Sequence, residues 1–202
     1  MKKTGYLGRV IGLSLVILAG LPGAAVLKGA ETYRFDNQAS AVLFYVRHMG
    51  VANAWGWFRE FSGTIVFDEE DLAASKVTIE VAADSIDTNL QKRDDHLRGP
   101  DFFSVKQYPK ITFESREVKE VEGKEGEYAV TGDLSLHGVT KEVTALFEFF
   151  GKGKHLANNS DIAGAEGTFT VKRSDFGMDY GVSNNAIGDE VTLIVSVEGV
   201  KE

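Results

Sequence analysis

Groups that could transfer protons are concentrated in one short stretch of the sequence. Residues 93–98 read Arg-Asp-Asp-His-Leu-Arg, so carboxylates, an imidazole and two guanidinium groups fall within two helical turns. Such a cluster could supply a general acid and a general base. The spacing is equally typical of a helix surface, because Asp94 and Arg98 form an i,i+4 pair and Arg98 complements the helix dipole. We favour the structural interpretation and keep acid–base chemistry by Arg93, Asp94 and His96 as the alternative.

Other chemistry-bearing patterns are absent from the sequence. There is no Walker-A loop, no Gly-x-Ser-x-Gly elbow, no His-Glu-x-x-His and no dinucleotide fingerprint. The chain has no cysteine, which excludes disulfides and thiolate sites. Its four histidines, at positions 48, 96, 137 and 155, lack the close spacing of a metal-binding pair. The sequence therefore predicts no catalytic residues, no metal site and no cofactor.

The first thirty residues follow the pattern of a signal peptide. They contain no acidic residue, and basic residues near the start precede an apolar run over residues 10–21. Small residues follow at positions 23–25, so we expect cleavage after Ala25, or as late as Ala30. The sequence thus predicts a periplasmic or secreted protein. An uncleaved membrane anchor is the alternative, although a Pro-Gly pair at 22–23 interrupts the apolar stretch near its end.

The composition indicates an acidic, folded protein. The chain has 22 Lys+Arg against 30 Asp+Glu, a net charge of −8. Residues 1–25 hold three of the basic residues and no acid, so cleavage leaves 19 basic and 30 acidic residues. Such a surface repels nucleic acid and anionic membranes. Hydrophobic residues make up 43% of the chain, enough for a proper core, and we expect residues 31–202 to form a single domain.

Apolar residues alternate with polar ones through most of the chain after residue 31, which is the pattern of half-buried strands. Eight strands are predicted, at about 33–48, 62–67, 77–81, 111–113, 128–136, 139–149, 163–171 and 191–197. Turn signals such as 68–71, 123–126 and 137–138 are too short for parallel crossovers, so the sheet is mainly antiparallel. Eight such strands could form a sandwich or a closed barrel. Thirteen Phe and several strand glycines favour the barrel, which has room for one small ligand.

One helix interrupts the strands, between the third and the fourth. Thr88 and Gln91 have the spacing of a capping box, and Gly99 followed by Pro100 is a typical helix end. Leu90 and Leu97 would lie on one face.

The aromatic run Trp55, Trp57, Phe58 and Phe61 falls in the link between the first two predicted strands. We interpret it either as core filling or as the mouth of the barrel, where aromatic rings would suit an apolar ligand.

Many short motifs, in order, are similar to one known family. They include Val46-Arg47-His48, Gly56-x-Phe58-x-x-Phe61-x-Gly63, Ser85-Ile86-Asp87-Thr88, Arg93-Asp94-x-His96-Leu97, Asp101-Phe102-Phe103, Tyr108-Pro109, Val130-Thr131-Gly132-Asp133-Leu134, His137-Gly138-Val139-Thr140-Lys141, Arg173-x-Asp175-Phe176-Gly177 and Asp189-Glu190-Val191. From about Tyr33 to Glu198 the chain resembles the YceI-like family of secreted or periplasmic polyisoprenoid-binding proteins. The resemblance implies an all-β, eight-stranded antiparallel lipocalin-like barrel.

The resemblance also implies a ligand: a long-chain isoprenoid, quinone-like or fatty lipid held in an elongated apolar cavity. The protein would act as an extracytoplasmic carrier or sequestering protein, and not as an enzyme. Successive side chains of a strand point alternately into and out of the barrel, and we call this alternation strand parity. Strand parity predicts these tunnel-lining residues: Phe44, Val46, Phe61, Ile65, Val81, Phe113, Leu134, Phe147, Phe169 and Leu193. The predicted residues of the mouth or head-group site are Arg47, His48, Trp57, Arg93, His96 and Lys172.

Two other functions stay open at this point: an enzyme acting on such a lipid, and a solid-core barrel that binds proteins during envelope stress. A homodimer and transient contact with a membrane or a membrane protein are also compatible with the sequence.

Overall fold

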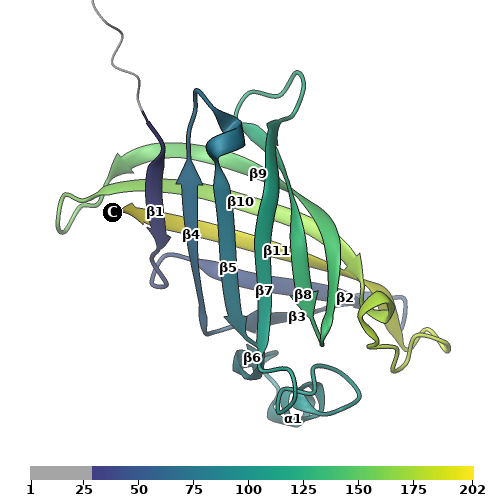
Figure 1. Cartoon of the computed structure of the whole chain (residues 1–202). Helices are drawn as coiled ribbons and strands as arrows, with labels where there is room; N and C mark the ends of the chain where they lie inside the picture. Colours follow the sequence, from purple (N-terminus) through teal and green to yellow (C-terminus); the bar gives the residue numbers. More distant parts are fainter. Residues whose placement is uncertain (1–28) are drawn as a thin grey trace, which may run out of the picture.

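The computed structural model describes residues 29–202, so the expected signal peptide, residues 1–25, lies outside the described residues. The described chain forms one antiparallel sheet with a single α-helix, α1 (Gln91–Arg98) (Figure 1). The strands are β1 (Glu31–Phe35), β2 (Ala41–His48), β3 (Ala52–Phe58), β4 (Phe61–Phe67), β5 (Lys76–Ala82), β6 (Ile86–Asp87), β7 (Lys110–Glu120), β8 (Glu127–Leu136), β9 (Val139–Lys154), β10 (Asp161–Lys172) and β11 (Ile187–Lys201). In this part of the chain no helix is long and apolar enough to cross a membrane.

Eight of these strands close into a barrel. The hydrogen-bonded order runs β1-β4-β5-β7-β8-β9-β10-β11, and β11 pairs again with β1. The remaining strands β2, β3 and β6 continue the sheet from β11. The predicted eight-stranded antiparallel barrel is therefore confirmed. Closure pairs every strand of the ring on both sides, which removes the exposed edges that an open sheet would have to protect.

The first predicted strand is wrong as a single element, because the chain bends between β1 and β2. Both pieces pair with β11, at Phe35↔Gly199 and Ala41↔Ser196. The Asp36 N–H donates to the Glu198 carbonyl at 2.8 Å, which holds the bend against β11. The break lets β1 close the ring against β4 while β2 leaves it to pair with β3.

Residues 52–58 form strand β3, where the sequence predicted a link. This strand pairs with β2 from Val42↔Phe58 to His48↔Ala52. Aromatic residues occupy both faces of this strand, at Trp55, Trp57 and Phe58, so the sequence does not show the polar–apolar alternation of a half-buried strand. Of these three residues only Phe58 is buried.

The helix ends as predicted but begins differently. Gly99 follows its last residue, in agreement with the predicted stop. The capping box is wrong: the N-cap is Leu90, and the Gln91 side chain bonds to Asp95 at 2.7 Å instead of returning to Thr88. The predicted Asp94–Arg98 pair is also wrong, because Asp94 turns into the protein and Arg98 contacts Asp95 at 3.3 Å.

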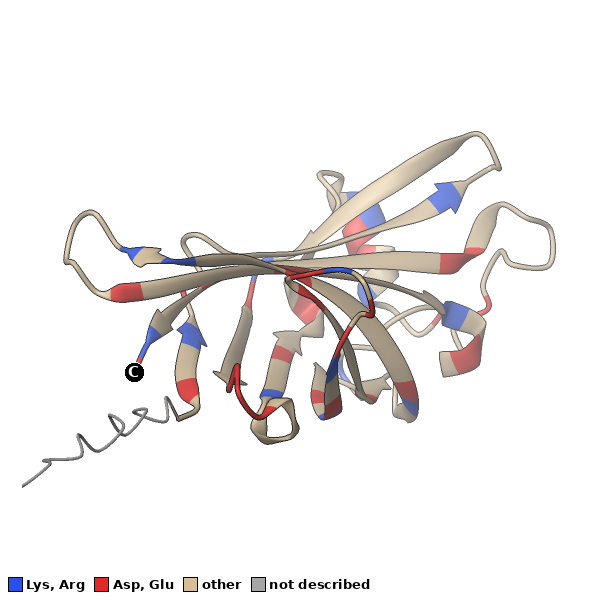
Figure 2. Cartoon of the chain, turned by 90° about the horizontal axis from the view of Figure 1, so that it is seen from above, with Lys and Arg blue, Asp and Glu red and all other residues tan. Residues whose placement is uncertain are grey.

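Charged residues are spread over many strands and loops (Figure 2). Several pair across neighbouring strands, such as Lys110 with Glu80 at 2.8 Å between β7 and β5. The barrel core is apolar, with residues such as Val42, Phe113 and Val195 buried inside it. The charged outer face and the apolar lumen follow directly from the period-two pattern of the strands.

Candidate functional site: an apolar cavity at one end of the barrel

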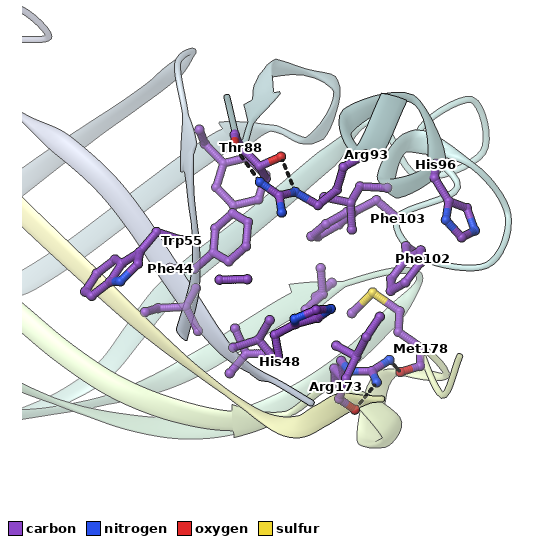
Figure 3. A pocket seen from close by; sticks show the side chains of 18 of the residues that line it. Phe44, His48, Trp55, Thr88, Arg93, His96, Phe102, Phe103, Arg173 and Met178 are labelled. Carbon is purple, nitrogen blue, oxygen red and sulfur yellow. Dashed lines mark hydrogen bonds between the residues drawn. The ribbon is translucent and has the colours of Figure 1, made fainter. Parts of the chain in front are cut away.

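A cavity of about 520 Å³ lies at the end of the barrel that carries α1 (Figure 3). Its volume falls within the range of about 300–1,000 Å³ typical of small-molecule sites. Aliphatic and aromatic side chains from six strands, from α1 and from neighbouring loops make most of the wall. The apolar lining residues are Phe44, Val46, Ala54, Trp55, Phe58, Leu90, Leu97, Phe102, Phe103, Ile111, Leu134, Leu136, Val171, Met178, Ile187, Val191 and Leu193.

Strand parity explains how the barrel supplies this wall. Phe44 and Val46 of β2 alternate with Leu43 and Tyr45, which face the other side of the sheet. The far wall comes from α1 and the loop that follows it, where Phe103 packs edge-on against Phe58 of β3, with ring centroids 5.6 Å apart. The α1 segment thus covers one end of the barrel and leaves space beneath it.

The predicted tunnel residues are spread along the whole barrel axis, and only some of them share this cavity. Phe44, Val46, Leu134 and Leu193 line it. A separate void of about 40 Å³ in the middle of the barrel is lined by Val81, Phe113, Phe147 and Phe169 together with eight other residues. A third void, of about 60 Å³, lies farther along and includes Ile65 and Phe147 in its wall. The described lumen is therefore one large cavity followed by two small voids, and Phe61 lines none of them.

Three of the residues predicted for the mouth line the cavity: His48, Arg93 and His96. The other three, Arg47, Trp57 and Lys172, are absent from its wall. Each of these three residues directly precedes or follows a lining residue in its strand, and successive side chains of a strand point to opposite faces. They therefore belong to the outer face, where the Arg59 guanidinium lies 5.2 Å from the ring centre of Trp57.

Thr88 fixes the position of the Arg93 side chain at the cavity wall (Figure 3). The Arg93 Nε donates to the Thr88 hydroxyl at 2.7 Å, and a terminal guanidinium nitrogen donates to the Thr88 carbonyl at 2.6 Å. The Thr88 hydroxyl and its backbone N–H both donate to one oxygen of the buried Asp94 carboxylate. Asp94 therefore joins the start of α1 to the preceding loop, and the oriented Arg93 remains largely exposed.

Arg173 is a second lining cation, and sequence reasoning missed it. Its side chain is 4% exposed and donates to the carbonyls of Met178, Tyr180, Ile187 and Gly188 at 2.7–2.9 Å. Burial lowers the pKa of Arg173, and the nearby Asp189 opposes that shift. No carboxylate in the described chain forms a salt bridge with it. Strand parity could have found this residue, because it continues the inward series of Phe169 and Val171.

The charged residues of the cavity wall are basic, whereas the protein as a whole is acidic. The lining includes Lys92, Arg93 and Arg173 but no aspartate or glutamate. His48 and His96 add two imidazoles. An acidic protein with a locally basic apolar site is suited to an amphiphile whose polar end accepts hydrogen bonds or carries negative charge.

Hydrogen bonds to different partners separate Asp94 from His96, the two residues that could act as acid and base. The Asp94 carboxylate accepts from Thr88, whereas His96 Nε2 lies 2.8 Å from the Asp101 carboxylate. The His96 ring also packs against Phe102 and Tyr180, with centroids 5.1 and 5.0 Å away. These contacts position the loop over the cavity, and they do not aim His96 and Asp94 at a common point.

One group of potential metal ligands lies outside this site, at the bend after β1. Side-chain atoms of Asp36, His155 and Glu198 lie within 4.8 Å of one another. However, His155 Nδ1 accepts the Ala157 N–H at 3.2 Å, so a neutral ring carries its proton on Nε2. The ring nitrogen thus already has a hydrogen-bond partner, and we assign no metal site to this group.

The fold and the cavity define a lipocalin-like barrel, a closed antiparallel barrel with an apolar ligand-sized space at one end. The family model of the YceI-like domain matches residues 33–199. Protein YceI of Escherichia coli O157:H7 is 39% identical over 207 residues, which cover 100% of both chains. The chain belongs to the YceI-like family.

Solved structures share the fold. The crystal structure of BcnA from Burkholderia cenocepacia has a TM-score of 0.73 and 25% identity, covering 81% of this chain and 98% of that chain. A polyisoprenoid-binding domain from Saccharophagus degradans, implicated in plant cell wall breakdown, has a TM-score of 0.62. It is 16% identical and covers 84% of this chain and 98% of that chain, so this second likeness shows the fold alone.

Proposed function

We propose that the protein binds the hydrocarbon chain of an isoprenoid or related amphiphilic lipid in the 520 Å³ cavity. The polar end of the lipid lies beside Arg93 and Lys92. The observation that carries the proposal is a ligand-sized apolar wall whose charged members are all basic. The fold shared with a polyisoprenoid-binding domain supports the same ligand class.

The energetics favour a carrier or a sequestering protein. Moving a chain from water into the cavity gains about 0.8 kcal/mol per methylene-sized group. A bilayer offers the same chain a similar gain, and ordering the chain in a cavity costs entropy. The protein thus competes with membranes by a small margin, which suits reversible loading. The signal-peptide pattern of residues 1–25 supports a place of action outside the cytoplasm.

The direct test is to extract the protein, purified from its own cell envelope, with organic solvent and to identify the bound molecules by mass spectrometry. A lipid with an isoprenoid or other long hydrocarbon chain at near-stoichiometric amount is the expected result. Recovery of no lipid, together with no uptake of added prenols in native mass spectrometry, would reject the proposal.

A paired substitution on β2 tests whether the cavity is the binding site. Val46→Trp places a large ring in the cavity, and Leu43→Trp places the same ring on the other face of β2, at a residue that lines none of the three spaces. We expect Val46→Trp to reduce prenol binding at least tenfold and Leu43→Trp to leave it unchanged. Equal effects from the two variants would place the ligand elsewhere.

The head-group contact has its own test, which compares a prenyl phosphate with the prenol of equal length. Arg93→Gln should remove the preference for the phosphate and leave prenol binding intact. At high salt the wild-type preference should also shrink, because the Arg93 side chain is exposed and screened. Equal binding of both ligands by the wild type at low salt would contradict an anionic head group.

A further inference from the structure

Exposed apolar side chains lie in the wall of the cavity and in the turn next to it. We call Met49, Val51, Trp55 and Leu90 the rim; they are 61%, 83%, 42% and 54% exposed. Trp55 and Leu90 also line the cavity, so its apolar wall continues to the protein surface at these two residues. Met49 is the first residue of the β2–β3 turn, directly after the lining residue His48, and Val51 is the last residue of this turn.

The β2–β3 turn carries apolar residues that folding does not require. The Val51 N–H donates to the His48 carbonyl at 3.1 Å, and the two central residues, Met49 and Gly50, have φ of 51° and 72°. Tight hairpin turns with two positive φ angles prefer Asn-Gly or Asp-Gly, and methionine is unfavourable at the first central position. An exposed methionine there, followed by an exposed valine, therefore needs a reason outside the fold.

The sheet is open beside the rim. Strand β6 pairs only with Trp57 and Phe58 of β3, so the outer edge of β3 over residues 52–56 has no strand partner in the described structure. Leu90, Lys92 and Arg93, at the start of α1, line the same cavity as Ala54 and Trp55 of β3. The unpaired edge of β3 and the start of α1 thus both lie at the cavity and outside the closed ring of the barrel.

We propose that the rim contacts the surface of a lipid bilayer, and that lipid passes between the bilayer and the cavity there. This inference rests on the proposed function, because a lipid ligand has to leave a bilayer to reach the protein. Apolar tips with a tryptophan and flanking basic residues are typical of contacts at the membrane interface, and Arg47, Lys92 and Arg93 are all exposed beside the rim. The excess of acidic residues elsewhere keeps the contact weak and confined to this end.

A vesicle-binding experiment with two matched variants tests the proposal. The probe is a vesicle of phosphatidylethanolamine and phosphatidylglycerol, and the readout is co-flotation of the protein. Val51→Asp puts a charge on the rim, whereas Leu156→Asp makes the same kind of change at a fully exposed residue of the β9–β10 loop, far from the cavity lining. We expect Val51→Asp to lower the bound fraction about tenfold. Leu156→Asp should behave like the wild type.

Uptake of a short prenol from aqueous solution separates this inference from the proposed function. Val51 lines no cavity, so Val51→Asp should take up the dissolved prenol normally and lose only the transfer of prenol from vesicles.

Absence of wild-type flotation, or equal flotation of both variants, would overturn the bilayer contact. Loss of a dimer in Val51→Asp, measured by analytical ultracentrifugation, would overturn it too and assign the rim to a second copy. Failure of prenol uptake by the wild type would instead count against the proposed function.

Discussion

Gly167 of β10 lies directly opposite Phe147 of β9, and the phenyl ring fills the space that a side chain at Gly167 would need. A Cβ built at position 167 would lie 2.4 Å from Cζ of Phe147. The ring therefore lies flat against the barrel wall. Phe147 also lines both small voids of the lumen, so its position determines how far the apolar space continues beyond the main cavity.

Gly167→Ala should destabilise the barrel by about 1–3 kcal/mol, because the added methyl group forces the Phe147 ring off the wall. Gly153→Ala is the control: a Cβ there meets only Ile162, at 3.8 Å. Urea unfolding followed by circular dichroism measures both variants. Equal stabilities would show that the ring moves without cost.

Phe147→Leu should join the two small voids and extend the apolar space along the barrel axis. We expect the variant to bind long prenols better relative to short ones, with a loss of stability of about 1–3 kcal/mol from the smaller side chain. Competition between prenols of different length in native mass spectrometry measures the preference. An unchanged length preference would show that the ligand ends within the main cavity.

Thr88→Val should destabilise the protein by about 1–3 kcal/mol, because it leaves the buried Asp94 carboxylate without its hydroxyl donor. It should also weaken binding of a prenyl phosphate, since Arg93 loses the hydroxyl that orients it. Thr88→Ser keeps the hydroxyl and should restore most of both properties. Unfolding curves and phosphate affinity are the two measurements, and a serine variant as impaired as the valine variant would refute this role of the hydroxyl.

Acid should weaken the contacts of Glu31 in β1, the strand that closes the barrel by pairing with β4 and β11. Hydrogen bonds from Lys152, Lys201 and Tyr33 lower the pKa of Glu31 from 4.5 to about 2. Because the pKa in the folded protein is depressed, the contribution of Glu31 is fully present above about pH 4.5 and is lost as the pH falls toward 2.

In Glu31→Gln, the free energy of unfolding should be lower than in the wild type near neutral pH, and the difference should vanish near pH 2. Denaturant unfolding between pH 2 and 6 measures this. A difference that stays constant over that range would show that the charge of Glu31 does not stabilise β1.

The barrel itself was predictable from local patterns. The alternation at residues 128–136 and 139–149, separated by two turn residues, predicts an antiparallel pair, and β8 and β9 form it. The broken first strand was not predictable in this way. Residues on both sides of the bend at Asp36 keep strand character, and only pairing with β4 on one side and β3 on the other separates β1 from β2.

The candidate site was predictable only in part, for a related reason. Parity places Phe44 and Phe113 inside the barrel alike, but Phe44 lines the main cavity and Phe113 a separate void. Position along the barrel axis depends on strand register and tilt, which involve residues far apart in the chain. Thr88 was predicted as a helix cap because its spacing to Gln91 is local, whereas its actual partner, Asp94, is selected by burial.

By itself, the sequence determined most of the secondary structure and the inward or outward direction of most strand side chains, because both depend on the preferences of residues close together in the chain. Only the tertiary structure decided where the lumen stays open. The volume left inside a barrel depends on how rings from opposite walls meet, and on which strands supply glycines for those rings to lie against. It was also the tertiary structure that set the buried Arg173 in the cavity wall, because the four carbonyls that hold it come together only when the loop between β10 and β11 is folded.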